Sequence, residues 1–120
     1  MRLSLTSGLT LFEVLLSLLL LSTVLLGLEA TELAALRLHY KAYFSSLAEQ
    51  QLHSLQERLR LLGSGPGLDA HLAAWTLENQ RLLPHSASRV AGLFPHYTLT
   101  LCWREPSEEK DACLHDTWIF

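Results

Sequence analysis

Apolar positions dominate the first quarter of the chain. Residues 9–28 form a continuous apolar stretch, interrupted only by Glu13, a few Ser and Thr residues and Gly27. A helix of about 20 apolar residues is long enough to cross the roughly 30 Å hydrocarbon core of a membrane. The pattern therefore predicts a transmembrane helix over residues 9–28.

The same helix is expected to continue beyond the apolar stretch. Over residues 29–62 apolar side chains recur at steps of three and four, with one slip near Gln50 and Gln51. This spacing is typical of one face of an amphipathic helix, and the Gly- and Pro-rich residues 63–67 then mark a turn. We expect a single helix over residues 9–62, about 80 Å long at 1.5 Å per residue. Its first half must be covered by lipid or by other subunits.

The remaining residues, 63–120, have the pattern of a small head. Residues 69–83 predict a short helix, with Asp69 as its N-cap and Pro84 beyond its end. Three strands are predicted after this helix, over residues 88–94, 97–104 and 113–120. The alternation of apolar and polar residues is clearest in the second strand. These elements predict an α+β fold, with a long N-terminal helix and a small C-terminal antiparallel β-sheet head.

Charge and composition exclude several classes of protein. The 120 residues include 9 Lys and Arg against 12 Asp and Glu, whereas a surface that binds nucleic acid usually needs a basic surplus. The chain is too short for a Rossmann enzyme or a TIM barrel. The six His are scattered, no zinc-ligand spacing is present, and no Ser lies in a nucleophile elbow. We therefore predict no catalytic residue, metal ligand, cofactor or nucleic-acid site, and we expect that the chain is not an enzyme.

An acidic side chain inside the apolar stretch needs an explanation. A cleaved secretory signal would end in a small-residue cleavage site, and none follows residue 28. A plain signal anchor fits the length of the stretch but gives Glu13 no role. A carboxylate in hydrocarbon is costly and usually marks function, although a position so near the end of the stretch can also lie among lipid headgroups.

The residues around Glu13 narrow these alternatives. The string SGLTLFEVLLSLLLL, which starts at Ser7, resembles the N-terminal cleavage and methylation motif of type IV pilins. The resemblance implies that residues 1–8 are a leader peptide, that a prepilin peptidase cuts after Gly8 on the cytoplasmic side, and that Leu9 becomes the N-methylated first residue. Glu13 is then the fifth mature residue, the acid of the family motif. Leu9 departs from the Phe that is common in the family.

Elementary chemistry agrees with this resemblance. Gly8 has no side chain and is a poor helix former, so we expect the backbone there to extend into the protease. Cutting creates a cationic α-amino group on Leu9, and Glu13 of a neighbouring subunit supplies an anion. Their attraction in a medium of low dielectric constant is large enough to set the axial register between subunits.

The head resembles one branch of the same family. Trp75, then Leu83 and Pro84, then Trp103 follow the helix in the order found in the minor pilins called PilV, the type IV pilus modification proteins. Residues 85–88 depart from the glycine-rich segment usual in that branch. The resemblance implies a structural minor pilin that helps prime assembly of a type IV pilus, or is incorporated into it, for motility, adhesion or DNA uptake. The implied partners are other minor and major pilins, the prepilin peptidase and inner-membrane lipid.

The resemblance also implies a location. The chain would cross the inner membrane once and place residues 29–120 in the periplasm or, within an assembled pilus, on the cell surface. The distribution of basic residues adds little, because only Arg2 precedes the span. Two alternatives stay open at this point: a minor pseudopilin of the I type in a type II secretion system, and a membrane-anchored periplasmic binding protein.

The chain has two cysteines, Cys102 and Cys113, at the two ends of the loop between the last two predicted strands. An extracytoplasmic location permits a disulfide bond between them. A hairpin suits the pair, and head disulfides are common in both family branches, so we expect the bond to form. Two free, buried thiols are the alternative, because neighbouring strands bring such residues within bonding distance only if their register agrees.

Overall fold

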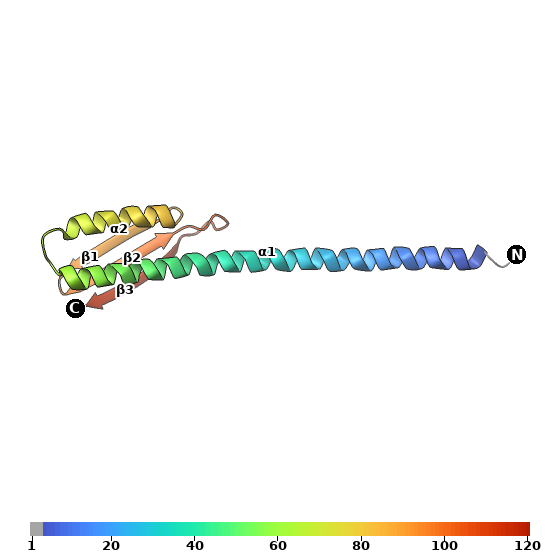
Figure 1. Ribbon diagram of the computed structural model, residues 1–120, viewed down its shortest axis with the longest axis horizontal. Coiled ribbons are helices and arrows are strands. Elements are labelled where there is room, and N and C mark those ends of the chain that lie inside the picture. Colours follow the sequence, from blue (N-terminus) through green and yellow to red (C-terminus); the bar gives the residue numbers. More distant parts are fainter. Residues whose placement is uncertain (1–3) are drawn as a thin grey trace. The chain divides into compact units, whose positions relative to one another are not determined.

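The computed structural model describes residues 4–120, with surface exposure described for Gly8 and for every residue from Thr10 onward. Two helices precede three strands along the chain (Figure 1): α1 (Ser4–Leu62), α2 (Leu68–Leu82), β1 (Ala87–Leu93), β2 (His96–Trp103) and β3 (Ala112–Ile119). The predicted α+β class is confirmed, because a long N-terminal helix is followed by a small antiparallel sheet.

The short elements lie close to their predicted positions. α2 and the three strands each begin and end within one residue of the predicted bounds. The predicted N-cap at Asp69 is wrong, since α2 starts at Leu68, directly after Gly67, and no side chain caps the helix. Gly67 has a φ of 103°, a left-handed conformation that glycine adopts at little cost. Asp69 lies instead in the first turn, where its negative charge interacts favourably with the positive end of the helix dipole.

α1 begins earlier than the apolar stretch predicts. It starts at Ser4 rather than at Leu9, so Gly8 is helical in the chain by itself. A glycine inside a helix costs about 1 kcal/mol relative to alanine, which neighbouring Leu residues with high helix propensity can offset. The helix ends as predicted at Leu62, before the turn at residues 63–67.

Backbone contacts divide the chain into an N-terminal unit, Met1–Leu38, and a C-terminal unit, His39–Phe120, with α1 running through both. Every side chain described in the N-terminal unit is exposed. From Phe44 onward, α1 contributes side chains to the core of the C-terminal unit. The buried core of the described chain therefore lies in the C-terminal unit.

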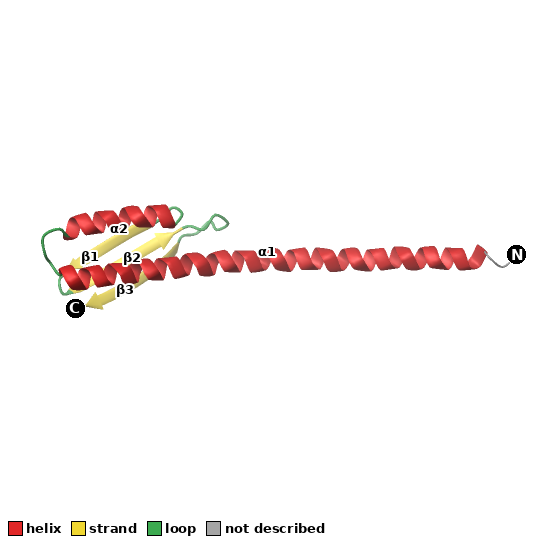
Figure 2. Cartoon of the chain, viewed as in Figure 1, coloured by secondary structure: helices red, strands yellow, loops and turns green. Residues whose placement is uncertain are grey.

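The sheet of the C-terminal unit has β2 in its centre, antiparallel to both β1 and β3. Its core-facing residues on β2 alternate as the sequence predicts and are all buried: Tyr97, Leu99, Leu101 and Trp103. The C-terminal part of α1 and the whole of α2 run alongside the strands (Figure 2), and both supply side chains to the same core. The sheet is therefore covered by helices on one face and open on the other.

A buried hydrogen bond connects α2 to α1 inside this core. Trp75 is completely buried, and its Nε1–H donates to the backbone carbonyl oxygen of Gln51 at 3.0 Å. Gln51 itself is buried, although it is polar. The slip in the helical pattern near Gln50 and Gln51 has its origin here, because a glutamine occupies a core-facing position where the periodicity predicts an apolar residue.

Candidate functional site

Glu13 lies exposed on α1, among apolar side chains. It lines a shallow groove with residues of the same helix that lie within about two turns of it: Thr10, Val14, Ser17, Leu18 and Leu21. The Ser17 hydroxyl donates to the backbone carbonyl oxygen of Glu13 at 2.8 Å, not to its carboxylate. The ion pairs found among the described side chains are Arg58 with Glu78 and Arg104 with Asp111. The Glu13 carboxylate thus has no basic partner in the described part of this chain.

The hydroxyl groups in the apolar stretch are satisfied within the helix. Ser22 Oγ donates to the carbonyl oxygen of Leu19, and Thr23 Oγ1 donates to that of Leu20, both at 2.8 Å. A hydroxyl bonded to the preceding turn can enter hydrocarbon at a lower cost than a free one. Glu13 differs from these groups, because no described side chain of α1 compensates its charge.

The apolar side chains of α1 have no cover from the rest of the chain. Over the stretch that is long and apolar enough to cross a membrane, no residue is buried. Phe12 and Leu26, for example, are each 65% exposed. The core helix of a soluble domain buries its apolar face, and a contiguous exposed apolar surface marks contact with a membrane or another protein. α1 is therefore a candidate membrane span.

The predicted cleavage site lies near the start of α1. The peptide bond between Gly8 and Leu9 is within the helix, and residues 1–3 of the predicted leader lie outside the described residues. A Cβ added at Gly8 would meet nothing within 4 Å, and the same holds at Gly27 further along α1. Open space surrounds Gly8, so local unwinding of the first turns of the helix would meet no packing.

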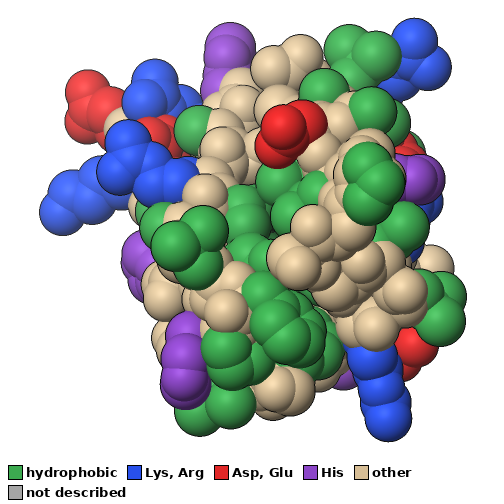
Figure 3. Space-filling view, turned by 90° about the vertical axis from the view of Figure 1, so that its left-hand side faces the viewer, with side chains coloured by type: hydrophobic (Ala, Val, Ile, Leu, Met, Phe, Trp, Pro, Cys, Tyr) green, Lys and Arg blue, Asp and Glu red, His purple; other side chains and the backbone are tan. Residues whose placement is uncertain are grey.

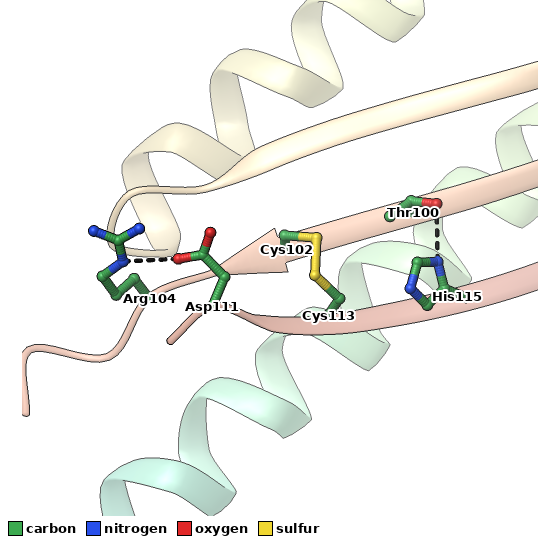
Figure 4. Close-up of a disulfide and its surroundings, with 6 residues drawn as sticks. All are labelled: Thr100, Cys102, Arg104, Asp111, Cys113 and His115. Carbon is green, nitrogen blue, oxygen red and sulfur yellow. Dashed lines mark hydrogen bonds and ion pairs between the residues drawn. A yellow bond between two sulfur atoms is a disulfide. The ribbon is translucent and has the colours of Figure 1, made fainter. Parts of the chain in front are cut away.

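A second candidate feature lies at the other end of the chain, on the open face of the sheet. Cys102 on β2 and Cys113 on β3 stand directly opposite each other and form a disulfide bond, with their Cα atoms 4.1 Å apart (Figure 4). The predicted disulfide is confirmed, and the alternative of two free thiols is wrong.

Two further pairs flank the disulfide on the same two strands and the adjoining loop. Arg104 Nε donates to Asp111 Oδ1 at 2.7 Å on one side, and Thr100 Oγ1 lies 3.1 Å from His115 Nδ1 on the other (Figure 4). The hydrogen bond and the charge of Asp111 raise the pKa of the Arg104 guanidinium above its usual value. The Arg104–Asp111 ion pair closes the loop between β2 and β3. A non-covalent contact between side chains therefore lies on each side of the disulfide.

With this geometry in view, the chain was compared with known proteins. No protein-family model, no curated protein and no solved structure matches it. The candidate features of function are therefore those of the chain itself: an exposed apolar stretch of α1 (residues 9–28) that contains one acid, a glycine five positions before that acid, and a small disulfide-bonded sheet.

Exposed apolar side chains also occur in the C-terminal unit. The end of α1, the turn between β1 and β2 and the end of β3 lie at one end of this unit (Figure 1), which Figure 3 views directly. Large apolar residues in these segments are strongly exposed: Leu61 by 83%, Leu93 by 85%, Phe94 by 50% and Ile119 by 72%. Hydrophobic side chains are visible at this surface among polar ones (Figure 3).

Groups suited to bind a metal ion do not gather in the described residues. No three side chains of His, Cys, Asp or Glu lie close enough to hold a metal there. His115 contacts Thr100, and His53 lines a small groove beside β3 together with Glu49 and Asp116.

Proposed function

We propose that this chain is a minor type IV pilin, a structural subunit that helps prime assembly of a type IV pilus or is incorporated into it. One observation carries the proposal: a single helix combines Gly8, the uncompensated acid Glu13 and a fully exposed apolar surface. A cut after Gly8 would place a new cationic amine on Leu9, and Glu13 is an anion without a basic partner among the described residues. The amine of one subunit and the Glu13 carboxylate of its neighbour can then form an ion pair.

The disulfide supports a location for the C-terminal unit. Disulfide bonds persist in oxidising compartments such as the bacterial periplasm and are rare in the cytosol. In the proposed arrangement α1 crosses the inner membrane once, residues 1–8 are cytoplasmic, and residues 29–120 are periplasmic. A reporter enzyme that works only in the periplasm should therefore be active when it is fused after Phe120. A reporter that works only in the cytoplasm should be inactive at the same position.

The exposed surface of α1 supports the proposed partners. Before assembly, inner-membrane lipid covers the apolar side chains, and the prepilin peptidase meets the start of the helix. After assembly, helices of other minor and major pilins replace the lipid. Both environments are apolar, so little hydrophobic free energy separates them, and polar contacts such as that of Glu13 decide which neighbours fit.

Expression beside a prepilin peptidase tests the proposal. We expect N-terminal sequencing and intact-mass analysis to show a mature chain that begins with N-methylated Leu9. Full-length protein in peptidase-positive cells, or a chain that starts beyond residue 28, would contradict it. Co-purification should recover pilins of a type IV pilus, and recovery with secretion-system pseudopilins instead would reject the pilus assignment.

Replacing Glu13 with Ala should leave membrane insertion intact and weaken incorporation into the assembly. Insertion should not suffer, because the span becomes more apolar. A partly desolvated charge pair worth more than about 1.4 kcal/mol implies at least a tenfold loss of association. The measurement is the amount of variant that co-purifies with its partner pilins from equal amounts of membrane.

Glu32 provides a matched control on the same helix. Glu32→Ala removes the same charge at an exposed position beyond the apolar stretch, and we expect it to co-purify like the unchanged chain. Equal recovery of the Glu13 and Glu32 variants would remove the special role that we give to Glu13.

A further inference from the structure

β3 is one of the two edge strands of the sheet. β3 pairs with β2 on one side only, because the strand order is β1-β2-β3. In an antiparallel pair, the backbone groups of alternate residues point toward the partner strand and away from it. Phe120 N–H donates to the Pro95 carbonyl oxygen, whereas Thr117 N–H donates to the side chain of Asp116 at 2.9 Å. The backbone groups at the free edge are therefore those of Cys113, His115, Thr117 and Ile119.

A groove of about 100 Å³ lies beside this edge, on the face of β3 that is turned toward α1. Glu49, Leu52 and His53 line it from α1, and Asp116 and Trp118 line it from β3. Leu52 is buried and Trp118 is half-buried, so the floor is apolar, while the carboxylates of Glu49 and Asp116 are exposed at its rim. The groove therefore combines an apolar floor with two negative charges.

Asp116 controls access to the edge. Its carboxylate accepts hydrogen bonds from Thr117 N–H and from the Nε1–H of Trp118, so it occupies one of the donors that an added strand would need. A charged residue on the inner face of an edge strand normally opposes pairing with another strand. A basic side chain in the incoming strand reverses this effect, because it attracts the carboxylate and leaves Thr117 N–H free to donate to the new strand.

We propose that β3 binds an extended peptide segment of another protein, with a Lys or Arg side chain placed in the groove between Glu49 and Asp116. Backbone hydrogen bonds to the edge supply affinity, and the alternate side chains that enter the groove supply specificity. The residue two positions from the basic one faces Trp118 and should be apolar. On the opposite face, the added strand would cover Ile119, which is 72% exposed.

A second copy of this chain does not fit the groove. β3 contains no Lys or Arg, so pairing two β3 edges would bring acidic grooves together. Added in the orientation that it has in its own sheet, β1 of a second copy would place Arg89 on the face of Thr100 and His115, with which it is in register, and not on the face of Asp116. The partner is thus a basic extended segment from another protein, whichever machine the chain serves.

The test uses the full chain in detergent micelles and a synthetic peptide, acetyl-Thr-Lys-Thr-Val-Thr-Val-amide. We expect amide shifts along β3 in NMR spectra, largest at residues 113–119. A peptide with Glu in place of Lys should bind at least about tenfold more weakly, which corresponds to about 1.4 kcal/mol. A peptide N-methylated at the amides that face β3 should lose binding.

Charge-reversal variants of the protein distinguish the proposed binding from non-specific binding of the peptide. Glu49→Lys should weaken binding of the Lys peptide by about tenfold or more and improve binding of the Glu peptide. Glu57→Lys makes the same charge change at an exposed position of α1 outside the groove and should change neither. Equal binding of the two peptides to the unchanged protein, no binding of the Lys peptide, or shifts that do not include β3 would overturn the proposal.

Discussion

Replacing Gly8 with Val is expected to leave the chain uncut in cells that contain a prepilin peptidase. The peptidase must grip an extended backbone at the bond between Gly8 and Leu9, and a β-branched side chain restricts that backbone and fills space next to the scissile carbonyl. A loss of about 2.7 kcal/mol of transition-state binding slows cleavage about a hundredfold. Immunoblots that resolve precursor from mature chain, with N-terminal sequencing of each band, measure the effect.

Gly27 provides the control for this substitution. A Cβ at either glycine would meet no atom within 4 Å, so neither Val side chain disturbs packing inside the chain. Both glycines lie in α1, and Gly27→Val should be processed at the normal rate. Normal processing of Gly8→Val, or equal loss in both variants, would contradict the assigned cleavage site.

The helical state of Gly8 adds a step to the proposed processing. α1 extends back to Ser4, so the first turns of the helix must unwind before a protease can hold the scissile bond in extended form. Helix ends lack part of their hydrogen bonds and open most easily. A glycine lowers the cost of unwinding by about 0.5–1 kcal/mol relative to alanine. Gly8 thus favours both the opening of the helix and the fit to the protease.

The elements of the fold were predictable wherever a side-chain period was strong. Alternation along β2 placed Tyr97, Leu99, Leu101 and Trp103 on one face, and all four are buried. The start of α1 was missed because hydrophobicity marks where lipid or a core covers a helix, not where its backbone hydrogen bonds begin. Asp69 was misassigned as a cap because Gly67, with its left-handed backbone, starts α2 without a side chain.

One candidate site could be predicted from the sequence and another could not. The disulfide could be predicted from the hairpin and the resemblance, and its register also determines which residues two positions away face each other: Thr100 with His115, and Arg104 with Asp111. The groove beside β3 could not be predicted. It depends on how α1 packs over the sheet, which brings Glu49 close to Asp116 although neither position stands out in the sequence.

Buried polar groups were also beyond prediction. Asn79 is completely buried and Gln51 nearly so, and both polar atoms of the Asn79 side chain and Oε1 of Gln51 lack hydrogen-bond partners among the described residues. The residue type alone does not reveal that Asn79 and Gln51 are buried, because it does not record the packing around these side chains. The carbonyl oxygen of Gln51 accepts a hydrogen bond from Trp75, so its backbone has a role that its side chain does not reveal.

Replacing both Cys102 and Cys113 with Ser should lower the free energy of unfolding of the C-terminal unit by about 2–4 kcal/mol. The bond joins residues 11 positions apart, and the chain-entropy model assigns about 3 kcal/mol to a loop of that size. Ser creates no core cavity, because both cysteines lie on the open face of the sheet. All three Trp residues are in this unit, so urea unfolding followed by Trp fluorescence reports on it without a signal from the membrane span.

Thr98 and Thr117 supply a matched control for the loss of the disulfide. They stand directly opposite each other on the same two strands and on the same face, with no covalent bond between them. Their double substitution by Ser should cost less than about 1 kcal/mol. An equally small loss of unfolding free energy in the Cys102 and Cys113 double variant would contradict the prediction. So would two thiols in the unchanged chain that react with an alkylating reagent after denaturation without reductant. Because a small domain is stable by only about 5–15 kcal/mol, a loss of 2–4 kcal/mol would remove a large part of the stability of the C-terminal unit wherever the disulfide cannot form.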